Sequence, residues 1–260
     1  STATITSASA AVSSGRSGLG ERKRRTGVAS MIPSRNPPST QPRGFVNPPT
    51  MAAENAFSAT PMPMNTDAVV IGSGPGGYVC GIRIGQLGKQ VICIEKEFVG
   101  GVCLNVGCIP SKALLHVAKV ITEAEEMRAH GVNFGQPQID INGVRGFKDG
   151  VVGKLTKGLA GLAKQRKVNV VQGVGQFSSP NTLQVTAADG TQQTIRFQNC
   201  IIAAGSSATK IPGYPYDDSR LIDSTGALAL VDIPKKLLVI GGGIIGLEMA
   251  CVYDALGSEV

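Results

Sequence analysis

Long apolar runs are missing from this sequence of 260 residues. No stretch approaches the roughly 20 apolar residues that a helix needs to cross a bilayer. The best candidate, residues 237–253, is interrupted by glycines and by Glu248. Histidine is scarce too, since His116 and His130 are the only two. The sequence offers neither a Cys/His metal cluster nor a Ser–His–Asp arrangement, so we expect no membrane span, no metal site and no hydrolytic triad.

A basic patch within the folded part is also lacking. The net charge is +7, but the segment before Pro63 carries seven Arg and Lys residues against two acidic ones. A domain that binds a polyanion should carry the basic patch itself. We therefore expect no nucleic-acid partner.

The six cysteines do not form the dense framework of a small secreted protein. Cys80 and Cys251 fall in helical patterns and Cys93 and Cys200 in strand patterns, so these four are predicted to be small buried hydrophobic residues. Cys103 and Cys108 are different, because two thiols this close can form a small disulfide loop. If they open a helix, its N-terminal dipole favours the thiolate.

Residues 1–63 are rich in Ser, Thr, Ala, Pro and Arg and show no apolar periodicity. Such a segment cannot bury enough surface to offset its ordering entropy, so we expect a disordered tail or extension. A translated upstream extension ending near Met64 is one interpretation, and an Arg-rich organellar transit peptide is another. The absence of an apolar core region argues against a secretory signal.

Glycine is abundant, with 34 residues, and strand patterns alternate with helical ones. We predict strands at 67–72, 90–94, 168–172, 182–185, 193–197, 200–203 and 237–240, with a hairpin turn at Asp189-Gly190. Helices are predicted at 76–87, 108–127, 141–167, 225–230 and 244–255. This alternation predicts an α/β fold of two Rossmann-like, doubly wound dinucleotide-binding domains.

The first strand leads into a glycine fingerprint, GSGPGG, at residues 72–77. Gly72 allows the tight turn, Gly74 lets the backbone approach a pyrophosphate, and Gly77 lets the helix pack on the strand. Glu95 ends the next strand, where an acid would hold a ribose hydroxyl. Strand, turn, helix, strand and acid together indicate a bound dinucleotide.

A second fingerprint follows the strand at 237–240, with Gly241, Gly243 and Gly246 in the corresponding positions. Two fingerprints imply two dinucleotides, so electrons could pass between them. The third glycine favours NAD over NADP, but the acid that would decide lies beyond Val260.

Between the fingerprints, residues 100–116 read GGVCLNVGCIPSKALLH, and IIAAGS follows at 201–206. With GSGPGG and GGGIIGLE, this run resembles the pyridine nucleotide-disulfide oxidoreductases, and most closely their dihydrolipoamide dehydrogenase branch, from about Asn65 to Val260. Glutathione reductases of the family differ at Leu104 and Ser111. Mercuric reductases are harder to separate by these motifs.

The resemblance implies FAD as the first cofactor and NAD as the second. Cys103 would exchange with a dihydrolipoyl substrate, Cys108 would contact the flavin, and Lys112 would lie near the flavin and pair with Glu248. Gly175 and Ala204-Gly205 match backbone positions that line FAD in the family. The implied domains are 64–208 for FAD, with the redox disulfide, and 209–260 for the start of a truncated NAD domain.

The implied reaction is oxidation of protein-bound dihydrolipoamide by NAD⁺, as the shared component of 2-oxo acid dehydrogenase complexes or in glycine cleavage. A homodimeric parent and a cytoplasmic location go with it, or a mitochondrial or plastid location if the tail is a transit peptide. The family's catalytic His–Glu pair lies outside the chain, and His116 is expected to be a packed helix residue. We expect residues 1–260 alone to be inactive and poorly stable. Another disulfide reductase and a truncated, non-catalytic flavin-binding protein are the alternatives.

Overall fold

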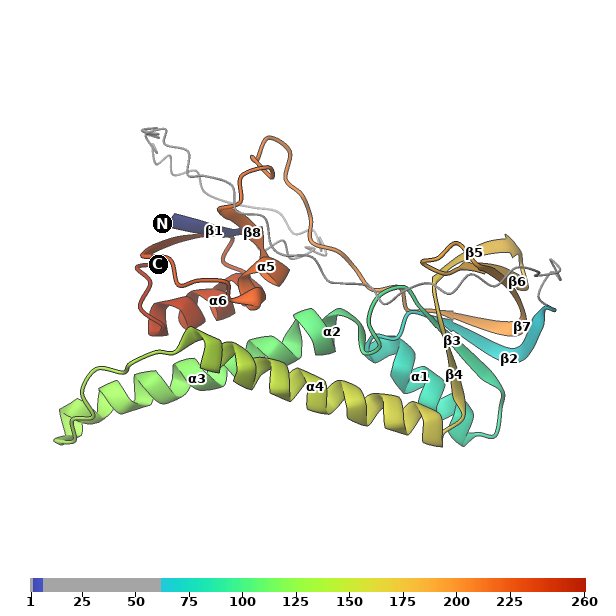
Figure 1. Ribbon diagram of the computed structural model, residues 1–260, viewed down its shortest axis with the longest axis horizontal. Coiled ribbons are helices and arrows are strands. Elements are labelled where there is room, and N and C mark those ends of the chain that lie inside the picture. Colours follow the sequence, from blue (N-terminus) through green and yellow to red (C-terminus); the bar gives the residue numbers. More distant parts are fainter. Residues whose placement is uncertain (1, 7–61) are drawn as a thin grey trace, which may run out of the picture. The chain divides into compact units, whose positions relative to one another are not determined.

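The computed structural model describes residues 2–6 and 62–260 of the chain (Figure 1). Most of the predicted tail, residues 1–63, therefore lies outside the described residues. Within it, Thr2–Thr6 forms strand β1, so the prediction of disorder is wrong there. All residues of TATIT except the alanine are β-branched, and such residues favour a strand once partner strands are available.

The larger sheet has six strands in the order β4-β3-β2-β7-β6-β5. Its parallel part consists of β2 (Met64–Ile71), β3 (Val91–Glu95), β4 (Val168–Gln172) and β7 (Gln192–Ile202). The antiparallel part adds β5 (Val174–Ser179) and β6 (Thr182–Thr186) beside β7. The α/β prediction and the hairpin are confirmed, and the sheet is mixed.

Two details of the sheet were not predicted. Strand β5 was missed, and the strands expected at 193–197 and 200–203 are one continuous strand, β7. The reason is that β7 pairs with two strands: residues 192–196 pair with β6, and residues 195–202 pair with β2. Ile195 and Phe197 are buried, but the alternation stops at residues 198 and 199, which are both exposed, and this interruption made the strand look like two.

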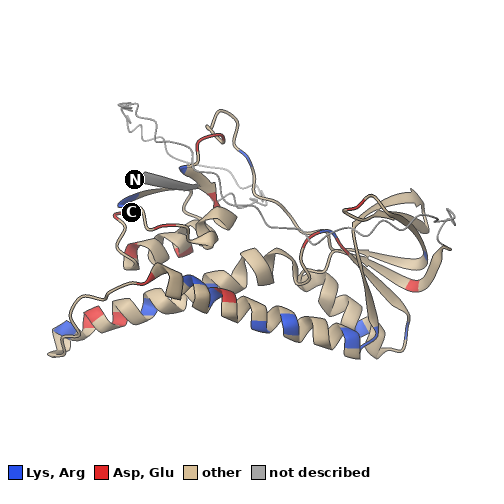
Figure 2. Ribbon diagram, in the orientation of Figure 1, with Lys and Arg blue, Asp and Glu red and all other residues tan. Residues whose placement is uncertain are grey.

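The helices of this part lie close to their predicted bounds. They are α1 (Pro75–Gln86), α3 (Cys108–Glu126) and α4 (Ile141–Gln165), and the side chain of Asp140 caps α4 by accepting from the N–H of Asn142. A 3₁₀ turn, η1 (Met127–His130), continues α3. The charges of α4 are mostly basic (Figure 2). The short helix α2 (Gly101–Val106) was missed, because its six residues lie between two glycines and show no helical period.

The smaller sheet contains β8 (Leu221–Asp223), β1 and β9 (Lys236–Ile240), all parallel. It is accompanied by α5 (Ser224–Ala229) and α6 (Ile244–Ala255), both near their predicted bounds. Leu114 and Ala118 of α3 share one buried core with Met249, Val252 and Tyr253 of α6. The helix that begins at Cys108 therefore packs directly on the helix of the second glycine fingerprint. The predicted domain boundary after residue 208 stays a prediction.

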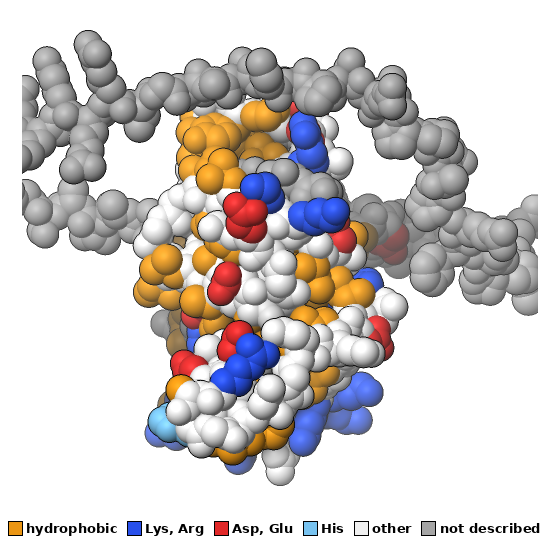
Figure 3. Space-filling view, turned by 90° about the vertical axis from the view of Figure 1, so that its left-hand side faces the viewer, with side chains coloured by type: hydrophobic (Ala, Val, Ile, Leu, Met, Phe, Trp, Pro, Cys, Tyr) orange, Lys and Arg blue, Asp and Glu red, His pale blue; other side chains and the backbone are white. Residues whose placement is uncertain are grey.

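Within the described residues, one helical stretch is long and apolar enough to cross a membrane by length and composition, Gly101–His130. It is not the stretch expected from the sequence, residues 237–253, and that expectation is wrong. The stretch is not one helix, because Gly107 breaks it with φ −143° and ψ −112°. On the face in Figure 3, hydrophobic side chains form small groups separated by charged and polar ones. The packing of α3 against α4 and α6 explains its apolar residues.

Candidate dinucleotide and dithiol site

The first glycine loop joins β2 to α1 and accepts no side chain at its outer glycines. Gly72 has φ +95°, and a Cβ there would lie 2.2 Å from the carbonyl oxygen of Ala203. A Cβ on Gly77 would lie 1.8 Å from the carbonyl oxygen of Gly72. Helix α1 then starts at Pro75 with no side-chain cap. An uncapped helix N-terminus behind a bare backbone loop fits the pyrophosphate of a dinucleotide.

Glu95 ends β3 beside this loop and is only 6% exposed. Its Oε2 accepts from the N–H of Ser73 at 2.8 Å and from the Ser73 hydroxyl, while Oε1 accepts from the N–H of Glu97 at 2.8 Å. Burial alone would raise the pKa of Glu95, but these hydrogen bonds outweigh it and lower the pKa. The carboxylate is thus ionised and fixed at the loop. Its contact with a ribose stays a prediction.

The other expected FAD-lining residues lie along the same edge of the sheet. Gly205 follows β7 and is exposed in open space. Gly175 lies on β5 against the side chain of Ile94. One glycine at this edge was missed: Gly173 is buried, has φ +152°, and donates its N–H to the carbonyl oxygen of Glu95 at 2.8 Å. A strand that ends on a glycine was the available signal.

The segment before the cysteines packs directly on the first loop. Gly100 donates its N–H to the carbonyl oxygen of Ser73 at 3.0 Å. A Cβ on Gly101, which has φ +60°, would lie 2.6 Å from the Cα of Gly74. Asn105 secures the turn by donating from Nδ2 to the carbonyl oxygens of Val99 and Gly101 at 3.1 and 2.9 Å. Helix α2 therefore begins in contact with the dinucleotide loop, which the sequence motifs alone did not reveal.

The two cysteines lie on consecutive helices, Cys103 within α2 and Cys108 as the first residue of α3. Neither cysteine takes part in a disulfide in this structure. Burial and a hydrogen bond with Cys108 raise the pKa of Cys103 to about 11, although the positive charge of Lys112 acts in the opposite direction. Thiolate is therefore not favoured at Cys103, because burial and the neighbouring thiol outweigh the backbone N–H of Cys108 and the charge of Lys112, which both lower the pKa.

Lys112 and Glu248 form an ion pair between α3 and α6. Glu248 also accepts a hydrogen bond from the hydroxyl of Ser111. Burial alone would raise the pKa of Glu248, but the hydrogen bonds from Lys112 and Ser111 outweigh it and lower the pKa. The pair expected from the family resemblance is thus present, and it connects the dithiol helix to the second fingerprint helix. Ser111 is a partner that the sequence analysis had not assigned to this site.

The second glycine loop repeats the local geometry of the first. Gly241 has φ +106°, as Gly72 has φ +95°. Gly243 precedes α6 with φ −77° and ψ 171° and no side-chain cap, as Gly74 precedes α1 with φ −68° and ψ −176°. Gly246 is buried inside α6. This loop also fits a pyrophosphate by the same reasoning.

Several other residues are placed away from these loops. His116 is exposed, so its prediction as a packed residue is wrong, and among the four cysteines expected to be buried only Cys93 is, while Cys251 is exposed. His116 and Cys251 each lie on a helix face, and the sequence does not show which elements pack against that face. No group of metal-binding side chains occurs among the residues that the structure describes.

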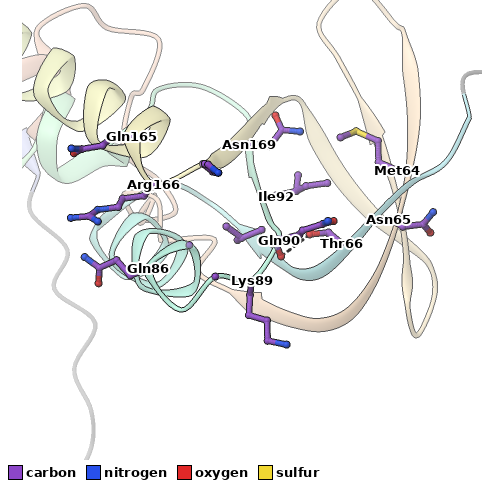
Figure 4. Close-up of a pocket in the computed structure, with 14 residues that line it drawn as sticks. Met64, Asn65, Thr66, Gln86, Lys89, Gln90, Ile92, Gln165, Arg166 and Asn169 are labelled. Atoms are coloured by element: carbon purple, nitrogen blue, oxygen red, sulfur yellow. Dashed lines mark hydrogen bonds between the residues drawn. The ribbon is translucent and has the colours of Figure 1, made fainter.

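A cavity of about 500 Å³ lies at the amino-terminal ends of β2, β3 and β4, away from the glycine loops at their carboxyl ends. Thr66, Gln90 and Asn169 line it together with Lys89 and Arg166. The side chains of Lys89 and Arg166 point in different directions (Figure 4). The two side chains therefore do not converge on one ligand. The cavity is separate from the candidate site because it lies at the opposite ends of the strands.

Comparisons with known proteins agree with this geometry. The family model described as pyridine nucleotide-disulphide oxidoreductase matches residues 66–260. Dihydrolipoyl dehydrogenase of Vibrio cholerae is 54% identical over 198 residues, covering 76% of this chain and 42% of that protein. Mitochondrial dihydrolipoyl dehydrogenase 2 of Arabidopsis thaliana is 46% identical over 225 residues, covering 84% and 44%. The chain spans less than half the length of these relatives.

A solved structure shares the fold. The Cu(II) complex of the HOCl-induced flavoprotein disulfide reductase RclA from Escherichia coli superposes with a TM-score of 0.64 at 28% sequence identity. The match covers 75% of this chain and 41% of that one.

Proposed function

Because the chain belongs to the pyridine nucleotide-disulfide oxidoreductases, we propose that it carries the disulfide half of a dihydrolipoyl dehydrogenase. The substrate is a dihydrolipoyl group, and the cofactors are FAD at the first glycine loop and NAD at the second. The observation that carries the proposal is the position of the dithiol helix α3. Its start packs on α2, which touches the first loop, and Lys112 connects it to the helix of the second.

In the proposed reaction the oxidised protein starts with a Cys103–Cys108 disulfide. One thiolate of the dihydrolipoyl group attacks the sulfur of Cys103 and releases Cys108 as a thiolate. The second dihydrolipoyl thiolate then attacks the mixed disulfide, releasing Cys103 and closing the lipoyl disulfide. Two electrons thereby move from the substrate to the cysteine pair, and Cys103 takes up a proton, consistent with its raised pKa of about 11.

When bound, the two dinucleotides supply hydride chemistry that carries these electrons to NAD⁺. The chain's own contribution is to bind and orient. The outer glycines admit the pyrophosphates, Glu95 lies where a ribose would be held, and Gly173 and Gly205 border the same edge. Lys112, paired with Glu248, holds a positive charge beside the dithiol. We propose that this charge steadies the thiolate of Cys108.

The partners of the proposed enzyme are the lipoyl domains of 2-oxo acid dehydrogenase complexes, and it acts as a homodimer. The location stays a prediction: relatives include one from Vibrio cholerae and a mitochondrial one from Arabidopsis thaliana. A second candidate is another disulfide reductase of the same fold, which the similarity to RclA supports. Leu104 and Ser111 favour the lipoyl enzyme over the glutathione branch.

The test uses the first half-reaction, the thiol–disulfide exchange, because both cysteines lie within this chain. The inactivity expected of residues 1–260 concerns the overall reduction of NAD⁺ by dihydrolipoamide. The protein, loaded with FAD and oxidised, is mixed with dihydrolipoamide or with glutathione, and free thiols at Cys103 and Cys108 are counted by alkylation and mass spectrometry. We expect dihydrolipoamide to open the disulfide and glutathione to leave it closed. Cys103→Ser should abolish the exchange, and Cys251→Ser, which removes an exposed cysteine on α6, should not change it. Opening by glutathione alone would contradict the proposal.

A further inference from the structure

Two neighbouring residues at the start of α3 hold opposite oxygens of one carboxylate. The Ser111 hydroxyl donates to Oε2 of Glu248, and the ammonium of Lys112 pairs with Oε1. Adjacent residues of a helix point about 100° apart, so they do not normally face the same group. The carboxylate of Glu248 reaches both because it enters from α6, between the two directions.

The three side chains differ sharply in exposure. Ser111 is 4% exposed, whereas the Lys112 side chain is 62% exposed and that of Glu248 is 19% exposed. The hydrogen bonds of the described residues give the Ser111 hydroxyl Glu248 as its partner. A hydroxyl buried this deeply would lose free energy without an acceptor. Ser111 is therefore committed to the carboxylate, while Lys112 keeps access to solvent.

Ser111 is also tied to the dithiol through the backbone. Its N–H donates to the carbonyl oxygen of Gly107 at 3.0 Å, across the turn that contains Cys108. Burial and the thiol of Cys108 raise the pKa of Cys103, whereas the backbone N–H of Cys108 and the positive charge of Lys112 lower it. How strongly Lys112 acts depends on how fully Glu248 neutralises it.

We propose that Ser111 is a positioning residue for the dithiol. By holding Oε2 of Glu248, Ser111 leaves Lys112 paired with Oε1 alone. The ammonium of Lys112 is then less fully neutralised, so its positive charge still acts on Cys103. The inference rests on the proposed function in that the dithiol is taken as the redox centre. Without the hydroxyl, the carboxylate would turn both oxygens to Lys112 and carry a less dispersed charge. Both effects disfavour the Cys103 thiolate.

The experiment measures the rate at which iodoacetamide alkylates Cys103 in the reduced protein at about pH 8, resolved from Cys108 by tandem mass spectrometry. For Ser111→Ala we expect the rate to fall about threefold, which corresponds to a pKa rise of about half a unit. Ser111→Thr keeps the hydroxyl and should retain the wild-type alkylation rate. Ser111→Val has nearly the shape of the threonine variant but no hydroxyl, so its rate should match that of the alanine variant. The Thr/Val pair decides the question if the alanine variant does not fold.

The matched control is Ser258→Ala. Ser258 is also 4% exposed, and its hydroxyl donates to the carbonyl oxygen of Pro234 at 2.6 Å, away from the dithiol. The Ser258→Ala variant should be less stable than the wild type, but Cys103 should be alkylated at the same rate. An unchanged rate in Ser111→Ala, equal rates in the Thr and Val variants, or an equal fall in Ser258→Ala would each overturn the proposal. Alkylation needs neither lipoamide nor nucleotide. The result for Ser111 can therefore be obtained even if the proposed function is wrong, and the two failures can be told apart.

Discussion

Alanine substitutions at two adjacent glycines of α1 should have opposite effects on stability. A Cβ on Gly76 would lie 3.7 Å from the Cβ of Ala203, an ordinary contact. Alanine is favoured over glycine in a helix by about 0.5–1 kcal/mol, so Gly76→Ala should be neutral or slightly stabilising. A Cβ on Gly77 would lie 1.8 Å from the carbonyl oxygen of Gly72 and 2.8 Å from its carbon. That obstacle is backbone, so it cannot move aside as a flexible side chain would.

The expected cost of Gly77→Ala is the upper end of the range for overpacking, about 3 kcal/mol. With a urea m value of about 2 kcal/mol per M, this loss lowers the unfolding midpoint by about 1.5 M. The assay is urea unfolding followed by circular dichroism, without added flavin, so that only the chain's own packing is measured. Equal midpoints for Gly76→Ala and Gly77→Ala would refute the reasoning that the third fingerprint glycine is required by the approach of α1 to Gly72.

Three further substitutions test the contacts between the helices. Glu248→Gln should lower the free energy of unfolding by about 1 kcal/mol near pH 7. This is less than the roughly 1.5–3 kcal/mol of a hydrogen bond to a charged group, because solvent screens the exposed Lys112. Since the pKa of Glu248 is lowered in the folded state, this difference is present above about pH 4.5 and should vanish as the pH falls through the folded pKa, which urea titrations at several pH values would show. Lys148→Met removes a buried ammonium that donates to the carbonyl oxygen of Leu228 at 2.9 Å, and should cost about 1–3 kcal/mol in the same assay. Tyr253→Phe removes a hydroxyl that donates to Ala227 at 2.9 Å, and should cost about 1 kcal/mol; burial raises the pKa of Tyr253 to about 12, so its ultraviolet titration should begin only in strong alkali. A stable Lys148→Met variant would mean that α5 is held without this contact.

Prediction from the sequence succeeded where a residue's local conformation decides. Gly72 and Gly241 were assigned as tight-turn residues, and both have positive φ. The helix predicted at 225–230 follows Asp223, a residue type favoured as an N-cap, and the side chain of Asp223 accepts from the N–H of Gly226 at 2.9 Å. The long helices α3 and α4 carry enough turns for their apolar period to be recognised, and their bounds agree with the prediction within two residues.

Prediction failed for short elements and for exposure. Helix α2 has six residues between glycines, and the partner strands of β1 lie more than 200 residues further along the chain. Strand β5 pairs with the next strand, β6, but most of its residues are exposed, so it shows no apolar alternation. None of the three elements has a periodic pattern long enough to be recognised. His116 and Cys251 were expected to be buried from their helical setting alone, but which face of a helix is covered depends on the elements packed against it.

The sequence by itself determined which residues can perform the chemistry: two thiols in one short segment, two glycine loops, and a lysine with a glutamate. Local rules suffice for these, because a positive φ, a helix cap or a cysteine spacing involves neighbours along the chain. Only the tertiary structure decided that Gly101 touches Gly74, that Gly173 supports Glu95, and that Ser111 shares Glu248 with Lys112. The last contact joins residues 137 positions apart. No local pattern encodes such a contact, because it exists only once α3 and α6 have buried their apolar faces against each other.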